Sequence, residues 1–82
     1  MNQSKDVSAE VKAVFLKTFN ISESSYSENL GPGDIQEWDS LGNVRLIQAI
    51  EAHFELSIDI MDLFDIETLS DFIDLIERYR SQ

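Results

Sequence analysis

The sequence contains no cysteine, so it offers neither a disulfide nor a thiolate that could bind a metal or act as a nucleophile. It also lacks any apolar stretch near the roughly 18 residues that are needed to span a bilayer. No apolar run follows a basic region at the N-terminus, as it would in a secretory signal. We therefore expect a cytoplasmic protein that does not enter membranes.

Basic residues are scarce, since six Lys and Arg stand against sixteen Asp and Glu and give a net charge of −10. Such a charge repels nucleic acid and anionic lipid, and it attracts partners with basic patches. Between Thr18 and Glu77 the only Lys or Arg is Arg45. Two interpretations of the acids stay open: they keep a small domain in solution, or they face a partner.

The chain has 82 residues, 43% of them hydrophobic, which is enough for one small core. We expect a single domain over residues 1–82, with residues 1–6 frayed. Helical periodicity predicts helices over residues 7–19 and 40–54, a short helical segment over 60–64, and a last helix from 69 to about 79. Thr68 and Asp71 fit a capping box before that last helix. The predicted fold class is all-α, a small bundle of three to four helices.

A long loop over residues 20–37 separates the first two helices, because this stretch is rich in Ser and Gly and has no sustained period. Apolar residues recur along it as anchors: Ile21, Tyr26, Leu30, Ile35 and Trp38. We expect the loop to lie over the bundle, with one turn at 34–37, and to deliver Asp39 and Ser40 to the surface. Trp38 is expected to anchor the loop in the core rather than to pack on a bound group.

The helix predicted after this loop begins at Asp39 or Ser40, because both residue types are strong N-caps. On its helical wheel the core face contains Leu46, Ile47, Ile50 and Phe54. Leu41 and Val44 fall on the far side with Arg45, so two apolar side chains are left beside the serine. This pattern is typical of a modification site with a docking surface, although Ser40 as an ordinary N-cap stays open.

Asp39-Ser40-Leu41, together with the long loop before it and the amphipathic helix, acidic segment and last helix after it, resembles the acyl carrier protein family. The resemblance extends from about Val7 to Tyr79. It implies that Ser40 carries 4'-phosphopantetheine, which a phosphopantetheinyl transferase attaches from coenzyme A. It also implies that the terminal thiol of this arm holds acyl groups as thioesters.

The resemblance gives roles to the neighbours of Ser40 as well. Asp39 matches an acid that the transferase recognises and that can help to hold a magnesium ion in such complexes, while helix capping remains the alternative. Leu41 and Val44 match positions that dock on partner enzymes. Arg45 departs from the family, which usually has an acid near this point, and we expect it to bias partner choice by repelling wrong partners.

Because of this departure, we expect other acids to provide more of the attraction for basic partners. These acids are Glu37, Asp39, Asp59, Asp62 and Asp65. The last three lack the spacing and the glycine of an EF-hand loop, so we expect no metal site there.

The sequence offers no catalytic pair for Ser40. The only histidine, His53, lies thirteen residues further along the same predicted helix, about 20 Å away at 1.5 Å per residue. A nucleophile and its base must meet within hydrogen-bond distance, so a serine hydrolase is excluded. We expect no enzyme activity, and a structural or surface role for His53.

We therefore predict a discrete, monomeric acyl carrier of a fatty-acid, polyketide or specialised pathway. Its partners would be the transferase and enzymes that load and process acyl groups. Leu63 and Phe72 are large where carriers of long fatty acyl chains often have small residues, which favours a short, polar or polyketide-type acyl group.

Two alternatives stay open. One is a stand-alone peptidyl or aminoacyl carrier. Such carriers usually have Gly before the acid or histidine and the serine of the motif, whereas Glu37 and Trp38 precede Asp39 here. The other is a small acidic helical adaptor that binds a protein partner without a prosthetic group.

Overall fold

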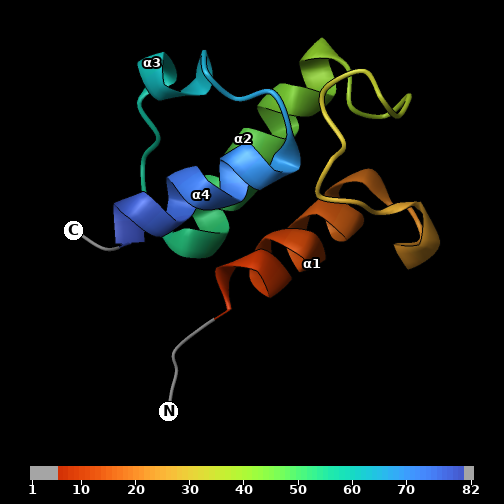
Figure 1. The fold of residues 1–82 in the computed structure, drawn as a ribbon, viewed down its shortest axis with the longest axis horizontal. Helices are drawn as coiled ribbons and strands as arrows, with labels where there is room; N and C mark the ends of the chain where they lie inside the picture. The colour runs from red at the N-terminus through yellow and green to blue at the C-terminus, as the bar shows by residue number, and fades with distance from the viewer. Residues whose placement is uncertain (1–5, 81–82) are drawn as a thin grey trace.

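A computed structural model describes residues 6–80, and these residues form a set of packed helices (Figure 1). The elements are α1 (Val7–Phe19), the 3₁₀ turn η1 (Glu23–Ser25), α2 (Ser40–Phe54), α3 (Ile60–Leu63) and α4 (Leu69–Arg80). The described residues contain no strand, which confirms the all-α prediction. Within residues 6–80, no helix is long and apolar enough to cross a membrane. Apart from Asp6, the end that we predicted to be frayed lies outside the described residues.

Helix α1 has the bounds that its periodicity predicts. Its buried residues recur three or four positions apart and form one stripe: Val7, Val11, Val14, Phe15 and Phe19. At the end of α1, Asn20 adopts the left-handed conformation, and its N–H donates to the carbonyl of Leu16. Asn tolerates this conformation better than most residues, so it is suited to end the helix.

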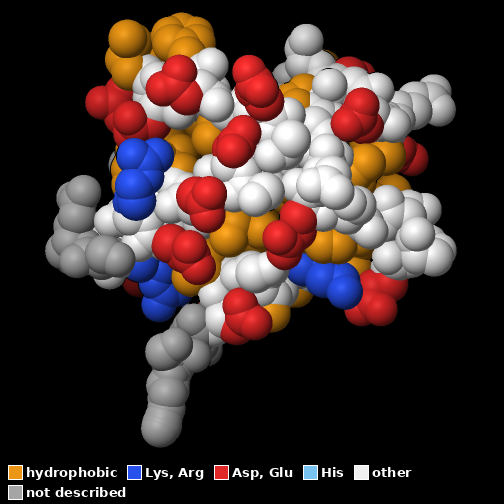
Figure 2. Space-filling view, in the orientation of Figure 1, with side chains coloured by type: hydrophobic (Ala, Val, Ile, Leu, Met, Phe, Trp, Pro, Cys, Tyr) orange, Lys and Arg blue, Asp and Glu red, His pale blue; other side chains and the backbone are white. Residues whose placement is uncertain are grey.

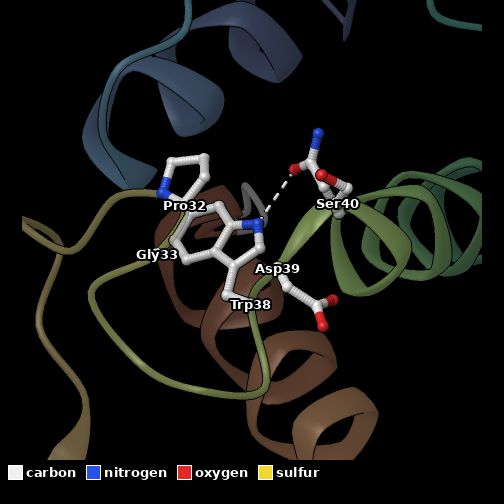
Figure 3. Close-up of a pocket in the computed structure, with 6 residues that line it drawn as sticks. Pro32, Gly33, Trp38, Asp39 and Ser40 are labelled. Atoms are coloured by element: carbon white, nitrogen blue, oxygen red, sulfur yellow. Dashed lines mark hydrogen bonds between the residues drawn. The ribbon is translucent and has the colours of Figure 1, made fainter.

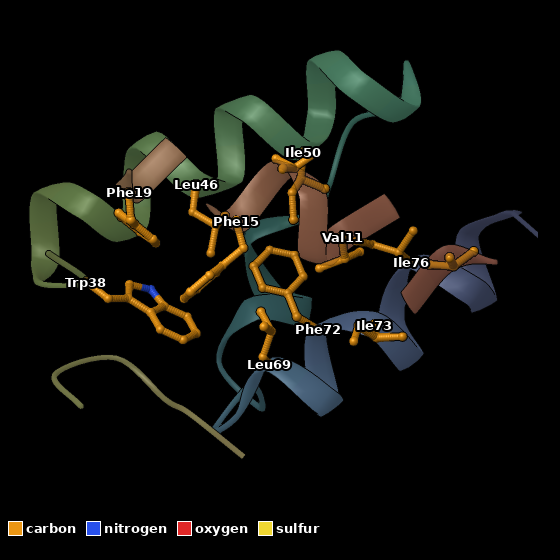
Figure 4. Packing of buried hydrophobic residues seen from close by; sticks show 12 residues of the cluster. Val11, Phe15, Phe19, Trp38, Leu46, Ile50, Leu69, Phe72, Ile73 and Ile76 are labelled. Atoms are coloured by element: carbon orange, nitrogen blue, oxygen red, sulfur yellow. The ribbon is translucent and has the colours of Figure 1, made fainter. Parts of the chain in front are cut away.

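The core lies where α1 packs against α2 and α4, and aromatic rings fill much of it (Figure 4). The ring of Phe15 meets that of Trp38 edge to face at 5.1 Å, and that of Phe19 at 4.9 Å. Such pairs add about 0.5–1.5 kcal/mol to the gain from burial. Trp38 has no exposed surface, so it anchors the preceding loop in the core, as predicted.

The segment between α1 and α2, residues 20–39, forms a strap that connects the end of α1 to the start of α2 (Figure 1). The predicted anchors Ile21, Tyr26, Leu30 and Ile35 are half-buried against the core. The N–H of Trp38 donates to the carbonyl of Ile35 at 3.1 Å, which closes a turn over residues 35–38, one position later than the predicted turn at 34–37. The turn η1 was not predicted, because three residues are too few to show a period.

The strap also completes the start of α4. The backbone N–H groups of Leu69 and Ser70 donate to carbonyls of the strap at 2.8 and 2.9 Å. The two segments approach closely at Gly31, where an added Cβ would lie 2.3 Å from the carbonyl oxygen of Glu67. Only glycine permits this approach, so Gly31 is required for the packing of the strap on α4.

Helix α4 begins with the predicted capping box. The N–H of Thr68 donates to Oδ2 of Asp71 at 3.2 Å, and the N–H of Asp71 donates to Oγ1 of Thr68 at 3.3 Å. The helix buries a wide face, which consists of Leu69, Phe72, Ile73, Leu75 and Ile76.

The short helix α3, which confirms the predicted segment, is tied to α4 by one hydroxyl. Asp59 caps α3, since its Oδ1 accepts from the N–H of Met61 at 3.0 Å. The Tyr79 hydroxyl accepts from the N–H of Asp59 at 2.8 Å and donates to Oδ2 of Asp62 at 2.6 Å. The hydrogen bond to Asp62 raises the pKa of Tyr79 above its usual value.

The outer side of α3 carries three large apolar side chains. Ile60, Met61 and Phe64 are 67%, 64% and 73% exposed. Helix α3 lies at the upper left in both overall views, and Figure 2 shows hydrophobic side chains beside acidic ones at this corner. The sequence predicts the helix but not that this side stays uncovered.

We expect Tyr79→Phe to loosen α3 selectively, because it keeps the ring and removes only the hydroxyl that bonds Asp59 and Asp62. Amide hydrogen exchange of residues 59–64 should become several-fold faster, while exchange in α1 and α2 stays unchanged. A uniform rise in exchange over all helices would contradict this local role.

Candidate functional site

The site begins with the residue that caps α2. Asp39 has an extended backbone, and its Oδ1 accepts from the N–H of Gly42 at 2.8 Å. Its backbone carbonyl accepts from the N–H of Asn43, also at 2.8 Å. The sequence left Asp39 and Ser40 open as the N-cap, and the structure places Asp39 there. Capping, the alternative role that we considered for Asp39, is therefore real.

Ser40 is the first residue of α2 and is exposed. Because Asp39 supplies the cap, the Ser40 hydroxyl is not needed for it, and the structure gives it no hydrogen bond to any residue of 6–80. The first N–H groups of a helix have no acceptor within it. The side chain of Asp39 accepts from the N–H of Gly42, and the bond from Asn43 to the Asp39 carbonyl is the first regular one of the helix. The N–H groups of Ser40 and Leu41, which have no acceptor among residues 6–80, are left to meet a group attached at the hydroxyl.

A pocket of about 350 Å³ lies beside Ser40 (Figure 3). Its lining residues come from the strap and from the first turn of α2: Pro32, Gly33, Trp38, Asp39, Ser40 and Asn43. The Trp38 indole N–H donates to Oδ1 of Asn43 at 2.9 Å, the bond that is dashed in Figure 3. Gly33 has a positive φ of 93°, and its N–H donates to the carbonyl of Trp38 at 2.7 Å. The strap is thus fixed against the start of α2, where the pocket can receive part of a group on Ser40.

Gly42 lets the first turn of α2 lie close to the end of the strap and to the end of α1. A Cβ at this position would lie 2.1 Å from the carbonyl oxygen of Glu37 and 3.1 Å from Cε1 of Phe19. The sequence analysis missed this residue. The available signal was a glycine near the start of a helix, which costs about 1 kcal/mol relative to alanine in a helix interior and so needs a packing reason.

The residues next to Ser40 are presented as the helical wheel predicts. Leu41 and Val44 are 72% and 50% exposed, and Arg45 is exposed as well, while Leu46 and Ile50 are fully buried. The only acid of α2, Glu51, is half-buried and accepts from the N–H of Ile58 through Oε2 at 2.8 Å. The solvent face of α2 therefore carries a positive charge in an otherwise acidic chain.

Of the acids predicted to attract partners, Glu37 and Asp39 lie directly before Ser40, and the other three lie at or just after α3. Asp59 and Asp62 form the hydrogen bonds that hold α3, and Asp65 is exposed. Asp62 and Asp65 also line a hollow of about 320 Å³ together with residues of α4. Among residues 6–80, no group of three or more His, Asp or Glu side chains is arranged to hold a metal ion.

His53 lies near the other end of α2, away from Ser40. Its Nε2 is 2.9 Å from Oε1 of Glu10, a contact that joins α2 to α1. The structure thus places His53 in a structural contact at the surface, as predicted.

We expect Asp39→Ala to lower the free energy of unfolding by about 1 kcal/mol, because it removes the cap of α2. Ser40→Ala, the matched control, should stay within about 0.5 kcal/mol of the wild type. Urea unfolding followed by circular dichroism measures both changes. An equal loss in the two variants would mean that the Ser40 hydroxyl serves the fold.

The comparison with protein families agrees with this geometry. The family model described as "Phosphopantetheine attachment site" matches residues 37–76, a segment that begins just before Ser40 and ends in α4. The match confirms the resemblance to acyl carrier proteins and the predicted prosthetic group, 4'-phosphopantetheine. No curated protein matches the sequence.

Proposed function

We propose that this protein, whose residues 37–76 match the phosphopantetheine attachment family, is an acyl carrier with Ser40 as its attachment residue. In the attachment step, Oγ of Ser40 would form a bond to the phosphorus next to the pantetheine part of coenzyme A. The bond from that phosphorus to the bridging oxygen would break, and adenosine 3',5'-bisphosphate would leave with that oxygen and the electron pair. The hydroxyl proton would go to a base of the transferase. When attached, the arm supplies a thiol that holds acyl groups as thioesters.

The observation that carries this proposal is the exposed hydroxyl of Ser40 at the first position of α2, which has no hydrogen-bond partner in the described part of the chain. A phosphodiester there would lie at the positive end of the helix dipole, next to the N–H groups of Ser40 and Leu41, for which residues 6–80 supply no acceptor. This position favours an anion by about 0.3–1 kcal/mol at an exposed site. The adjacent pocket leaves room for the start of the arm.

Asp39 would serve both the fold and the transferase. Its Oδ1 bonds the N–H of Gly42, whereas its other oxygen remains available to a magnesium ion or a cationic group of the transferase. Capping also fixes the direction of the carboxylate beside Ser40. The two roles that the sequence left open for Asp39 are therefore compatible.

Docking would use the exposed side chains around Ser40. Leu41 and Val44 provide apolar contact, and Arg45 would select against partners with a basic surface opposite α2. Asp65, and the outward parts of Asp59 and Asp62, would face basic groups of loading and processing enzymes. Such contacts at exposed charges are weak, which suits a carrier that moves between enzymes.

The cargo proposal follows from the packing of the core. Phe72 is 1% exposed within the hydrophobic cluster, and Leu63 packs against that cluster. Because side chains already fill this interior, a short, polar or polyketide-type acyl group suits the protein better than a long chain that must be buried.

The competing function is an acidic adaptor without a prosthetic group. The observation in its favour is the uncovered apolar side of α3, with Ile60, Met61 and Phe64. Such an adaptor would bind a partner protein, and Ser40 would remain unmodified.

Incubation with coenzyme A and a broad-range phosphopantetheinyl transferase tests the proposal. We expect intact-mass spectrometry to show the gain of one phosphopantetheine in the wild type and none in Ser40→Ala. Circular dichroism confirms that both proteins are folded. A folded wild type that gains no mass would overturn the carrier and favour the adaptor.

We expect Arg45→Glu to raise kcat/KM for loading by a transferase with a basic docking face, by about two- to fivefold at low salt, since one exposed ion pair contributes about 0.2–1 kcal/mol. The gain should shrink as salt screens the pair. Arg78→Glu on α4 makes the same change in net charge and is the matched control. An equal gain in both variants would show that net charge, not the position of Arg45, controls loading.

A further inference from the structure

The side chain of Asn43 lies next to Ser40 and lines the same pocket. Residues three apart are neighbours on the surface of an α-helix, so Asn43 sits one turn below the hydroxyl on the same side of α2. Asn43 belongs neither to the motif around Ser40 nor to the proposed docking residues. Its position alone makes it a candidate contact for a group on Ser40.

Trp38 fixes the direction of the Asn43 carboxamide. An indole N–H can only donate a hydrogen bond, so the atom that faces it at 2.9 Å is the oxygen of Asn43. Since Trp38 is fully buried against Phe15 and Phe19 of α1, it holds that oxygen in place. Nδ2 of Asn43 must then point away from the indole, and it has no hydrogen-bond partner among residues 6–80.

A hydrogen-bond donor at this position would offset negative charge beside Ser40. A phosphodiester on Ser40 adds a negative charge beside the carboxylate of Asp39, in a chain that already has a net charge of −10. The N–H groups of Ser40 and Leu41 meet this charge from the end of the helix. Nδ2 of Asn43 supplies a further donor from the pocket, and hydrogen bonds to an ionised acceptor are the strong ones.

We infer that Asn43, oriented by Trp38, donates a hydrogen bond from Nδ2 to a phosphodiester oxygen on Ser40 and so holds the start of the arm in the pocket. This inference rests on the proposed attachment at Ser40. Pro32 and Gly33 of the strap are exposed and line the other side of the pocket, so the start of the arm would lie between them and Asn43. Asn43 is a positioning residue, since it forms and breaks no covalent bond.

Nuclear magnetic resonance of the labelled protein before and after loading with coenzyme A tests this contact. We expect the side-chain NH₂ signals of Asn43 to move downfield and to exchange more slowly with water once the mass shows one arm per chain. In holo Asn43→Asp, the ³¹P signal should shift and report a more mobile phosphate. This variant can still accept from the indole, and an acid in the first turn favours the helix, so it should fold.

Trp38→Phe tests whether the indole must orient the Asn43 amide, because it keeps an aromatic ring in the core but removes the indole N–H. With Asn43 still in place, the response of its NH₂ signals to loading should be lost. Gln48→Glu makes the same change from amide to carboxylate on the exposed side of α2, and its ³¹P signal should match the wild type.

The outcomes separate the two proposals. Failure to gain the arm would overturn the attachment at Ser40 itself. Full loading with unchanged NH₂ signals of Asn43, or a ³¹P signal in Asn43→Asp that equals the wild type, would overturn the contact and leave the carrier function intact.

Discussion

The segment around Ser40, at the start of α2, depends on the packing of one buried side chain, the indole of Trp38. Its ring packs against Phe15 and Phe19 of α1, and its N–H donates to Asn43 in the first turn of α2. One side chain thus joins the first helix, the strap and the second helix. Because these three segments meet at a closely packed residue, the start of α2 is held firmly although it lies at the surface. A flexible prosthetic arm needs such a fixed base, since partner enzymes must recognise the protein around it.

The sequence predicted most of the helices because their information is local. The apolar periods of α1 and α2 and the Thr68–Asp71 box each depend on residues that lie a few positions apart, and the structure confirms them. The prosthetic group followed from a motif in its helical setting. What the sequence did not show depends on how the strap and α1 lie against the first turn of α2: the fit of Gly42 against Glu37 and Phe19, and the direction of the Asn43 amide. No local pattern encodes such contacts, and the three residues of η1 are too few to form one.

The charges illustrate the same limit. The acids of the sequence predicted that Asp59 and Asp62 would face partners, which stays a prediction. The structure adds that both form hydrogen bonds that fix α3, one through its cap and one through Tyr79. A carboxylate that already accepts a hydrogen bond offers less to an incoming cation. The net charge also gives no information on the exposed apolar side of α3, with Ile60, Met61 and Phe64. The surface therefore divides into a locally basic face on α2 and an apolar edge with acids around it on α3.

The strap also forms backbone hydrogen bonds with the start of α4. Leu30 and Glu28 accept the backbone N–H groups with which α4 starts, so neither segment can complete its hydrogen bonds alone. The same strap carries Trp38 and leads to Ser40, so the packing of α4 on the strap also supports the surroundings of the serine. A substitution at the start of α4 can therefore disturb the serine although the two lie about thirty positions apart in the sequence.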